Sequence, residues 1–469
     1  MPQQREQDAE EYDADAKIAT AHYEFAGSES EGWTVLRNRL PWLDLGPGYR
    51  FLDVASCGVC STDLARRFLP FPLPQVIGHE VVVKDDAGER YVVEINASCV
   101  ARGLKTWCSF CERGLPTHCP QRLTIGIDRL PGGFGAGILA PCNALLPVPM
   151  SLPTETAVMV EPFAAALHAV EGVAPKAGEV IAVLGPRRLG MLALAALAAW
   201  RKDRGVDFKI LALPRRDGLS ALALAMGADE VKVLRGTEEG LADVVIDTTG
   251  HPLGLEAALL LAKREVHLKS THGQAAAGLS KLTELVVDEI GIARADLDGE
   301  LPGGFALSSG ERPLVVWCSE EKPPESWRSA AQILLAATAA EAAAILKANP
   351  ALHPLGRADA VVVDTSAQID EALRYDAALE LSLLRPRGLV LLTAKSKPKG
   401  ALAQAVVERG LRLSSSRCGD FHLALRLLDS SDEFRKLGQT FVTHRFRRGE
   451  LAEALRVAAT PACIKAVVN

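Results

Sequence analysis

The sequence predicts an α/β protein in which a β-rich part precedes a parallel sheet wound with helices. From about residue 33 to 150, short apolar or alternating runs such as YRFLDVAS and EVVVKD are separated by Gly and Pro, which is typical of a barrel-like β domain. From about residue 155, Ala- and Leu-rich stretches alternate with short buried strands such as VIAVLG and FKILAL, which indicates βαβ units. A chain of 469 residues favours two or three domains.

Composition excludes several classes of protein. The formal net charge of -6 offers no electrostatic footprint for nucleic acid, and no apolar run is long enough to span a membrane. The acidic start MPQQREQDAEEYDADAK is unlike a signal peptide, so a cytoplasmic protein is expected. Because residues 1–30 are charged and poor in apolar side chains, we expect them to be mostly disordered or loosely attached, within a polar extension over residues 1–32.

Part of the chain resembles another part of itself. The segments ADVVIDTTG (242–250), EAALLLAKREVHLKSTHG (256–273) and LTELVVDEIGI (282–292) are echoed by ADAVVVDTS (358–366), LELSLLRPRGLVLLTAKS (379–396) and LAQAVVERGLRL (402–413). The order and spacing indicate a duplicated half of a nucleotide-binding fold, although convergent α/β patterning produces similar echoes. Either the first copy completes the sheet and 293–410 is an appended lobe, or the second copy takes that place. We expect the first arrangement, because the first copy follows the strand at 180–184 directly.

The cysteines favour metal binding over disulfides. Five of the ten lie between positions 99 and 142, unlike the framework of a secreted protein. The stretch CSFCERGLPTHC has the C-x2-C spacing of a closed tetrahedral zinc site, with the fourth thiolate coming from further upstream. The expected structural zinc ligands are Cys99, Cys108, Cys111 and Cys119; four unrelated free thiols are the alternative.

Three other segments carry ligand types for a second metal site. CGVCSTDL (57–64), IGHEV (77–81) and EPFAAALHAV (161–170) offer a thiolate, an imidazole and carboxylates. Three such ligands hold zinc while leaving a position open, where the ion acts as a Lewis acid on an alcohol oxygen. A single cysteine or histidine of this kind more often has a structural role. The occurrence of all three segments in this order favours a metal site.

The segment VLGPRRLG has the strand, turn and helix of a dinucleotide site but not its full glycine pattern. Arg187 stands where the middle glycine of G-x-G-x-x-G is expected, between Gly185 and Gly190. The next strand, FKILALPRR, ends in Arg215 and Arg216 rather than in the carboxylate that binds a ribose 2′-hydroxyl. Two guanidiniums would instead pair with a 2′-phosphate, which predicts NADP rather than NAD. The alternative is that both arginines lie in a solvated loop and bind nothing. The expected cofactor-binding residues are Gly185, Arg187, Arg188, Leu189, Gly190, Arg215 and Arg216.

Taken in order, these motifs and the ending SSSRCGDFHLALRLL…FVTHRF…IKAVV resemble the zinc-dependent medium-chain dehydrogenase/reductase superfamily, in its threonine, sorbitol and glucose dehydrogenase-like branch. The resemblance covers roughly 33–290 and 411–469, and the block between has no counterpart in the family's usual architecture. It implies a GroES-like catalytic domain and a Rossmann domain. The implied division is 1–32 for the extension, 33–160 for the catalytic domain, 161–292 for the Rossmann domain, 293–410 for the inserted lobe and 411–469 for a segment that returns to the catalytic domain.

The resemblance also assigns roles to residues. Cys60, His79 and Glu161 match the catalytic zinc ligands, and Glu80 matches a carboxylate that can exchange onto the metal. Thr62 matches the hydroxyl that takes the substrate proton, and Asp63 the carboxylate that orients the zinc-bound imidazole. Ala65 stands where some alcohol dehydrogenases place a relay histidine, and His168 matches no ligand.

The resulting prediction is an oxidoreductase that interconverts a secondary alcohol or polyol and its ketone by hydride transfer, with NADP or NAD, in a homo-oligomer of two or four chains. Two other hypotheses remain: a catalytically weakened or inactive descendant that serves as an interaction module, suggested by Arg187 and the insertion, and a zinc-free reductase of the same fold.

Overall fold

A computed structural model describes residues 3–270, 273–302, 312–376, 381–394 and 398–469. The chain forms two compact units, one made of Met1–Ala164 with Cys418–Asn469 and the other of Ala165–Arg417. Because residues 271–272, 377–380 and 395–397 are outside the described ranges, the expected repeat segments 256–273 and 379–396 are described only in part. Among the helices of the described ranges, none has the length and apolar character needed to cross a bilayer.

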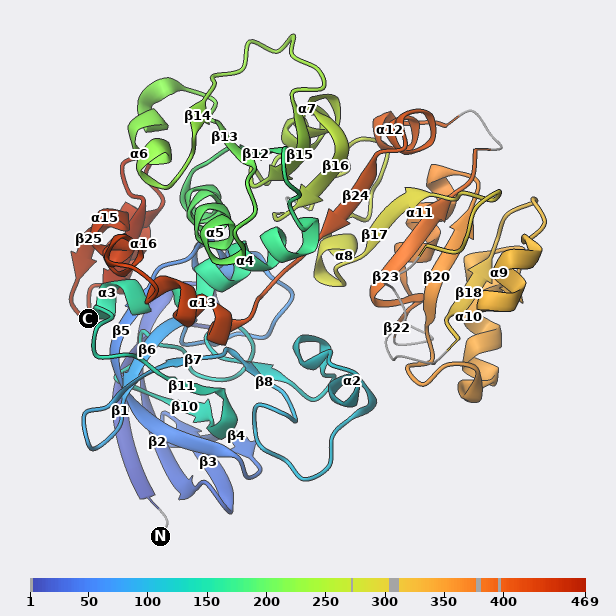
Figure 1. Ribbon diagram of the computed structural model, residues 1–469. Helices are drawn as coiled ribbons and strands as arrows, with labels where there is room; N and C mark the ends of the chain where they lie inside the picture. The colour runs from blue at the N-terminus through green and yellow to red at the C-terminus, as the bar shows by residue number, and fades with distance from the viewer. Residues whose placement is uncertain (1–2, 271–272, 303–311, 377–380, 395–397) are drawn as a thin grey trace. The chain divides into compact units, whose positions relative to one another are not determined.

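The first unit is built mainly on two sheets, beside a small sheet of β8 and β9 (Figure 1). Its larger sheet has the order β11-β7-β6-β5-β26-β25, with β10 also paired to β5. Four of these strands are β7 (Arg90–Val93), β10 (Gly137–Pro141), β11 (Leu145–Pro147) and β25 (Val442–Phe446). The strands β5 (Tyr49–Gly58) and β6 (Glu80–Lys84) are antiparallel neighbours, and the C-terminal strand β26 (Lys465–Val468) pairs with the end of β5. The last residues of the chain therefore lie beside the segment that begins at Cys57.

The expectation of disorder over residues 1–32 is wrong. β1 (Gln3–Tyr12) and β2 (Ile18–Ser28) form an antiparallel sheet with β3 (Gly32–Arg37) and β4 (Leu40–Leu45). The polar composition hides an alternation in which every second side chain of β2 is buried. The one carboxylate buried in β1, Glu11, accepts hydrogen bonds from Tyr23 and Arg37, so its charge is compensated.

The second unit contains a continuous sheet of eleven strands, in the order β14-β13-β12-β15-β16-β24-β17-β23-β20-β18-β19. Its first part holds β12 (Val180–Leu184), β13 (Lys209–Leu213), β15 (Ala242–Asp247) and β16 (Ala262–Leu268), all parallel. Its other part holds β18 (Leu314–Trp317), β19 (Gln332–Leu335), β20 (Ala358–Val363) and β23 (Leu384–Leu392), again parallel. The remaining strand of the first part is the short edge strand β14 (Glu230–Val231).

The expectation that the first copy completes its own sheet, with 293–410 as an appended lobe, is wrong. The strand that follows β16 in the sheet is β24 (Arg412–Ser415), which comes after the second copy. The last strand of the first copy, β17 (Gly291–Arg294), pairs in parallel with β23 of the second copy. The two exchanged strands meet as antiparallel neighbours, with Ile292 opposite Leu413 (Figure 1). The sequence pattern identifies strands but not their partners, so continuity along the chain was a poor guide to pairing.

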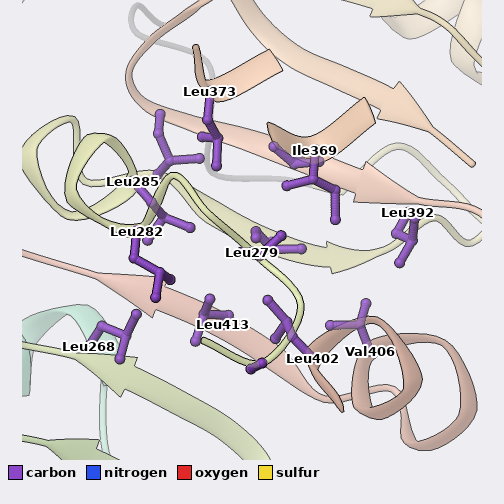
Figure 2. Close-up of a cluster of buried hydrophobic side chains, with 14 of the residues drawn as sticks. Leu268, Leu279, Leu282, Leu285, Ile369, Leu373, Leu392, Leu402, Val406 and Leu413 are labelled. Atoms are coloured by element: carbon purple, nitrogen blue, oxygen red, sulfur yellow. The ribbon is translucent and has the colours of Figure 1, made fainter. Parts of the chain in front are cut away.

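One hydrophobic core serves both copies. Leu268 and Leu285 come from the first copy and Ile369 and Leu392 from the second, and all four belong to the same buried cluster. Figure 2 shows these side chains gathered around β24, together with Leu402 and Val406 of α12 (Ala401–Arg409). The second copy also has a separate cluster that contains Trp317 and Trp327, so the two copies share one core without giving up every core of their own; this shared core agrees with the strand exchange.

A line of buried polar side chains joins β24 to β16. Alternate residues of the two strands point to one face of the sheet. Ser414 donates to Glu265 Oε1 at 2.5 Å and lies 2.7 Å from His267 Nδ1, while His267 Nε2 lies 2.8 Å from Ser416 Oγ and Lys269 Nζ donates to the same oxygen at 3.2 Å. All five side chains are buried. Burial, followed by the charges of Lys269 and His168, holds the pKa of His267 well below its usual value, so its ring is neutral with one donating and one accepting nitrogen.

We predict that Ser414→Ala destabilises the second unit, because Glu265 and His267 each lose a buried partner. Such a loss costs roughly 1 to 3 kcal/mol in the free energy of unfolding. Urea unfolding followed by circular dichroism measures it, with Ser329→Ala on an exposed helical face as the matched control, for which a change within about 0.5 kcal/mol is expected. Equal stability of the two variants would contradict the role given to the polar line.

Candidate functional site

The segments that follow β5 and precede β6 bring four of the predicted residues together. Cys60 precedes the short helix α1 (Ser61–Ala65), and its backbone N–H donates to Asp63 Oδ2 at 2.7 Å. The Cys60 Sγ lies 3.7 Å from Thr62 Oγ1, and His79 Nδ1 lies 3.4 Å from Asp63 Oδ1. Asp63 and His79 are buried, whereas Cys60 is partly exposed. The helix start therefore presents a thiol and a hydroxyl beside a buried imidazole–carboxylate pair.

The surroundings of His79 favour positive charge. Burial acts to lower the pKa of His79, but the Asp63 carboxylate and the Cys60 side chain outweigh it and raise that pKa well above its usual value. With Nδ1 facing Asp63, the ring offers Nε2 to a ligand, which is the arrangement that a carboxylate imposes on a metal-binding imidazole. The donor set of a thiolate and an imidazole fits zinc.

Glu80 is held by a residue that the sequence reasoning missed. Lys465 Nζ donates to Glu80 Oε1 at 2.7 Å and to the Val59 carbonyl at 3.2 Å. Both side chains are buried, and Gly58 is required beside them, because a Cβ there would lie 2.1 Å from Glu80 Oε2. A lone lysine inside the apolar ending CIKAVVN is the signal that could have pointed to it. The role of Glu80 as an exchangeable metal ligand stays a prediction, and it requires this ion pair to open.

Glu161 lies near the start of α4 (Val160–Val173) and is partly buried. Burial acts to lower the pKa of Lys465, but its interactions with Glu80, Cys60 and Glu161 together raise it. Glu161 therefore contributes to the same electrostatic environment as Cys60. Its role as the third zinc ligand stays a prediction.

The structural cysteines form the tightest ligand group among the described residues. Cys99 follows β8 (Asn96–Ala97), Cys108 and Cys111 flank the start of α2 (Ser109–Glu112), and Cys119 follows a 3-10 turn, Pro116–His118. Their four Sγ atoms all lie within 4.8 Å of one another. Burial acts to raise the pKa of Cys108, but hydrogen bonds from its neighbours, above all the backbone of Cys111, lower it below the usual value and so favour the thiolate that binds zinc. This geometry suits a closed tetrahedral site.

The turn after β12 keeps the backbone geometry of a phosphate-binding turn. Gly185 has φ +72°, and its N–H donates to the Leu213 carbonyl at the end of β13. Gly190 lies where a Cβ would be 2.6 Å from Thr248 Oγ1, so α5 (Arg188–Arg204) packs closely on the end of β15. Arg187 immediately precedes the helix and is exposed; among the described residues, no side-chain hydrogen bond caps the helix start. The start of α5 and the positive end of its dipole therefore form a place that suits an anion.

The predicted 2′-phosphate residues follow the neighbouring strand. Pro214 after β13 is buried, whereas Arg215 and Arg216 are exposed. β12 and β13 are parallel, with Leu184 opposite Leu213. Both arginines and Gly185 therefore lie at the carboxyl end of the sheet. Leu189, by contrast, lies within α5 and is partly buried. Ligands of open parallel sheets bind at the carboxyl ends of the strands. Arg187, Arg215 and Arg216 follow strands at that end, where the cofactor is predicted to bind.

Comparison with known proteins identifies the family of the chain. Residues 46–150 match the alcohol dehydrogenase GroES-like domain. A probable alcohol dehydrogenase of Mycobacterium tuberculosis is 30% identical over 267 residues, which cover 49% of this chain and 70% of the relative. The chain belongs to the medium-chain dehydrogenase/reductase superfamily. The predicted family and the predicted GroES-like plus Rossmann fold class are thereby confirmed.

Other relatives of this dehydrogenase superfamily are more distant. The (R,R)-butanediol dehydrogenase of Saccharomyces cerevisiae is 25% identical over 252 residues, covering 44% of this chain. The match spans 65% of the length of that relative. A zinc-binding dehydrogenase of Sinorhizobium meliloti, solved bound to NADP, superposes with a TM-score of 0.53 at 17% identity over 99% of both chains. At this identity the likeness concerns the fold.

We predict that Cys111→Ser removes one zinc ion per chain and lowers the melting temperature, because three thiolates hold a structural zinc far less well than four. Elemental analysis and calorimetry of the purified protein measure both changes. Cys142→Ser is the control, since this cysteine belongs to the same unit, is partly buried and lies outside the cluster. Full zinc content in the Cys111 variant would contradict the assignment.

Proposed function

We propose that the protein is a zinc-dependent oxidoreductase that interconverts a secondary alcohol or polyol and its ketone with NADP, and with NAD less efficiently. The observation that carries this proposal is the group formed by Cys60, Thr62, Asp63 and His79. A protein that needed only the fold has no reason to bury an imidazole against a carboxylate and to present a thiol beside it. The superfamily membership and the names of the relatives support the reaction class.

Within this proposal, Cys60, His79 and Glu161 hold the catalytic zinc, with Glu80 as an exchangeable carboxylate. The ion, when bound, supplies a Lewis acid to the substrate oxygen, and the nicotinamide supplies the hydride acceptor. Asp63 fixes the orientation of His79. The Thr62 hydroxyl, beside Cys60, would take the proton of the alcohol while giving its own to the cofactor ribose or to water, because Ala65 offers no relay imidazole. Lys465 holds the Glu80 carboxylate in an ion pair, and Glu80 can reach the metal only when this pair opens.

The cofactor part of the proposal rests on the second unit. The turn at Gly185 and the start of α5 bind the pyrophosphate, and Arg215 and Arg216 pair with a 2′-phosphate. The S. meliloti structure bound to NADP supports a cofactor of this kind. Arg187 moves the pyrophosphate outward from the position that a glycine would allow, and its guanidinium compensates by pairing with the phosphate.

We predict that Cys60→Ala and His79→Ala each lose one zinc ion per chain and lower turnover of secondary alcohols by roughly 100-fold or more. Asp63→Asn, which leaves the ligands in place, weakens zinc binding roughly 10- to 100-fold. Elemental analysis and a nicotinamide absorbance assay with a panel of secondary alcohols and polyols measure these effects, with Cys142→Ser as the control. Undiminished turnover in the Cys60 and His79 variants would refute the catalytic assignment.

We also predict that calorimetric titration finds tighter binding of NADPH than of NADH. Arg215→Ala combined with Arg216→Ala removes two charge-assisted contacts and lowers NADPH affinity roughly tenfold or more, with little effect on NADH. Arg204→Ala is the matched control, since this exposed arginine lies at the opposite end of α5. If neither nucleotide binds, the dehydrogenase proposal fails and an inactive descendant becomes the better description.

A further inference from the structure

The two copies in the second unit are arranged as the halves of a symmetric pair. Read from the junction outwards, one side of the sheet has the order β24-β16-β15-β12-β13 and the other β17-β23-β20-β18-β19. Apart from β14, which pairs with β13 at the outer end of the first side and has no counterpart, each strand on one side has an equivalent at the same place on the other, and all neighbours within a side are parallel. Only the central pair, β24 and β17, is antiparallel. An antiparallel contact between equivalent strands is the form that a two-fold isologous interface takes.

The connections that exchange the two central strands cross each other at a pair of glycines. Gly278 precedes α8 (Leu282–Val287) and β17, while Gly400 precedes α12 and β24. Both have φ +92°, and a Cβ on either would lie within 3 Å of the other's Cα, at 2.9 and 2.8 Å. The Leu402 N–H donates to the Ala277 carbonyl at the same point. The crossing thus has the approximate symmetry of the sheet, and it is too tight for any side chain.

The second copy lacks the features that prepare the first for a dinucleotide. Seven residues, 318–324, separate β18 from α9 (Glu325–Ala330), a helix of six residues, whereas Gly185–Arg187 alone separate β12 from the 17-residue α5. The Asp364 carboxylate fills the turn after β18: it accepts from Ser319 Oγ at 2.6 Å and from the Glu320 N–H at 2.9 Å. An N–H that a phosphate would need is therefore already used.

The charge at this turn is also opposite to that at the first one. Glu320 and Glu321 are exposed or partly exposed beside Asp364, where the first copy has Arg187 and Arg188. In the first copy, the equivalent aspartate, Asp247, accepts hydrogen bonds from Thr249 in its own loop, and no bond from the turn after β12 to Asp247 is among those that the structure gives. Two carboxylates and a filled turn repel a pyrophosphate.

We infer that the second copy is a built-in partner: it supplies the other half of a two-fold sheet junction within one chain, binds no nucleotide, and leaves the protein a monomer with a single cofactor site. The strand edge through which a second chain would extend the cofactor sheet is covered by β17 of the same molecule. The other edge of that part is β14, a strand of two residues that offers little for pairing. The monomer replaces the homo-oligomer that the family resemblance implies, and the count of cofactor sites rests on the proposed function.

Two measurements on the full chain test this inference. Sedimentation equilibrium at 10 to 100 μM, on the order of typical enzyme preparations, is expected to give the chain mass of 50.0 kDa. A concentration-dependent dimer would overturn the monomer, and Leu335→Lys at the exposed edge strand β19 would then show whether that edge pairs. This arm needs no cofactor, so it stands even if the proposed function fails.

The second measurement is the stoichiometry of NADPH binding by calorimetry, expected to be one per chain. The Arg215→Ala and Arg216→Ala double variant weakens this single isotherm, whereas Glu320→Ala combined with Glu321→Ala at the equivalent edge of the second copy leaves it unchanged. Two sites per chain, or a loss of binding in the glutamate variant, would overturn the inference. Binding of neither nucleotide would refute the proposed function instead, and the mass would still decide the built-in partner.

Discussion

The seating of β24 between β16 and β17 is the constraint on which the second unit depends. Without this strand the cofactor sheet ends at β16, and the copy that follows has no contact through which to share its core. The position is specified twice, by apolar side chains such as Leu413 in the common core and by the buried polar line from Glu265 to Lys269. Apolar burial alone would tolerate a shifted register. The polar side chains do not, because a slip of one residue turns each of them away from its partner.

The first unit uses the same principle at its predicted metal site. The end of the chain returns as β26 and brings Lys465 to Glu80, next to the loop that begins with Cys60. A buried ion pair adds little net stability, but its removal on one side leaves an uncompensated charge. The charge of Glu80 is therefore compensated only when β26 has paired with β5 and brought Lys465 into place.

Sequence reasoning found the elements and the order of the site residues, but not what depends on distant pairing. Short motifs contain Cys60, Thr62, Asp63 and His79, and the structure brings these four residues together. β1 escaped detection because Glu11 is buried with its own partners, Tyr23 and Arg37, so its alternation does not appear as apolar and polar. The destination of β24 was mistaken, since a strand pattern carries no information on its neighbour. Lys465 was missed because its partner lies 385 positions away.

The crossing at Gly278 and Gly400 has a consequence for the order in which the chain folds. Neither copy can complete its part of the sheet alone, because β24, from after the second copy, pairs with β16 of the first, and β17 of the first copy pairs with β23 of the second. During synthesis, β16 remains an open edge until the whole second copy and β24 have left the ribosome. Such distant pairing raises the contact order and slows folding. An unfinished sheet edge also invites pairing with other chains. Early in its life the molecule is therefore most exposed to aggregation at the very strand that is best protected in the native state.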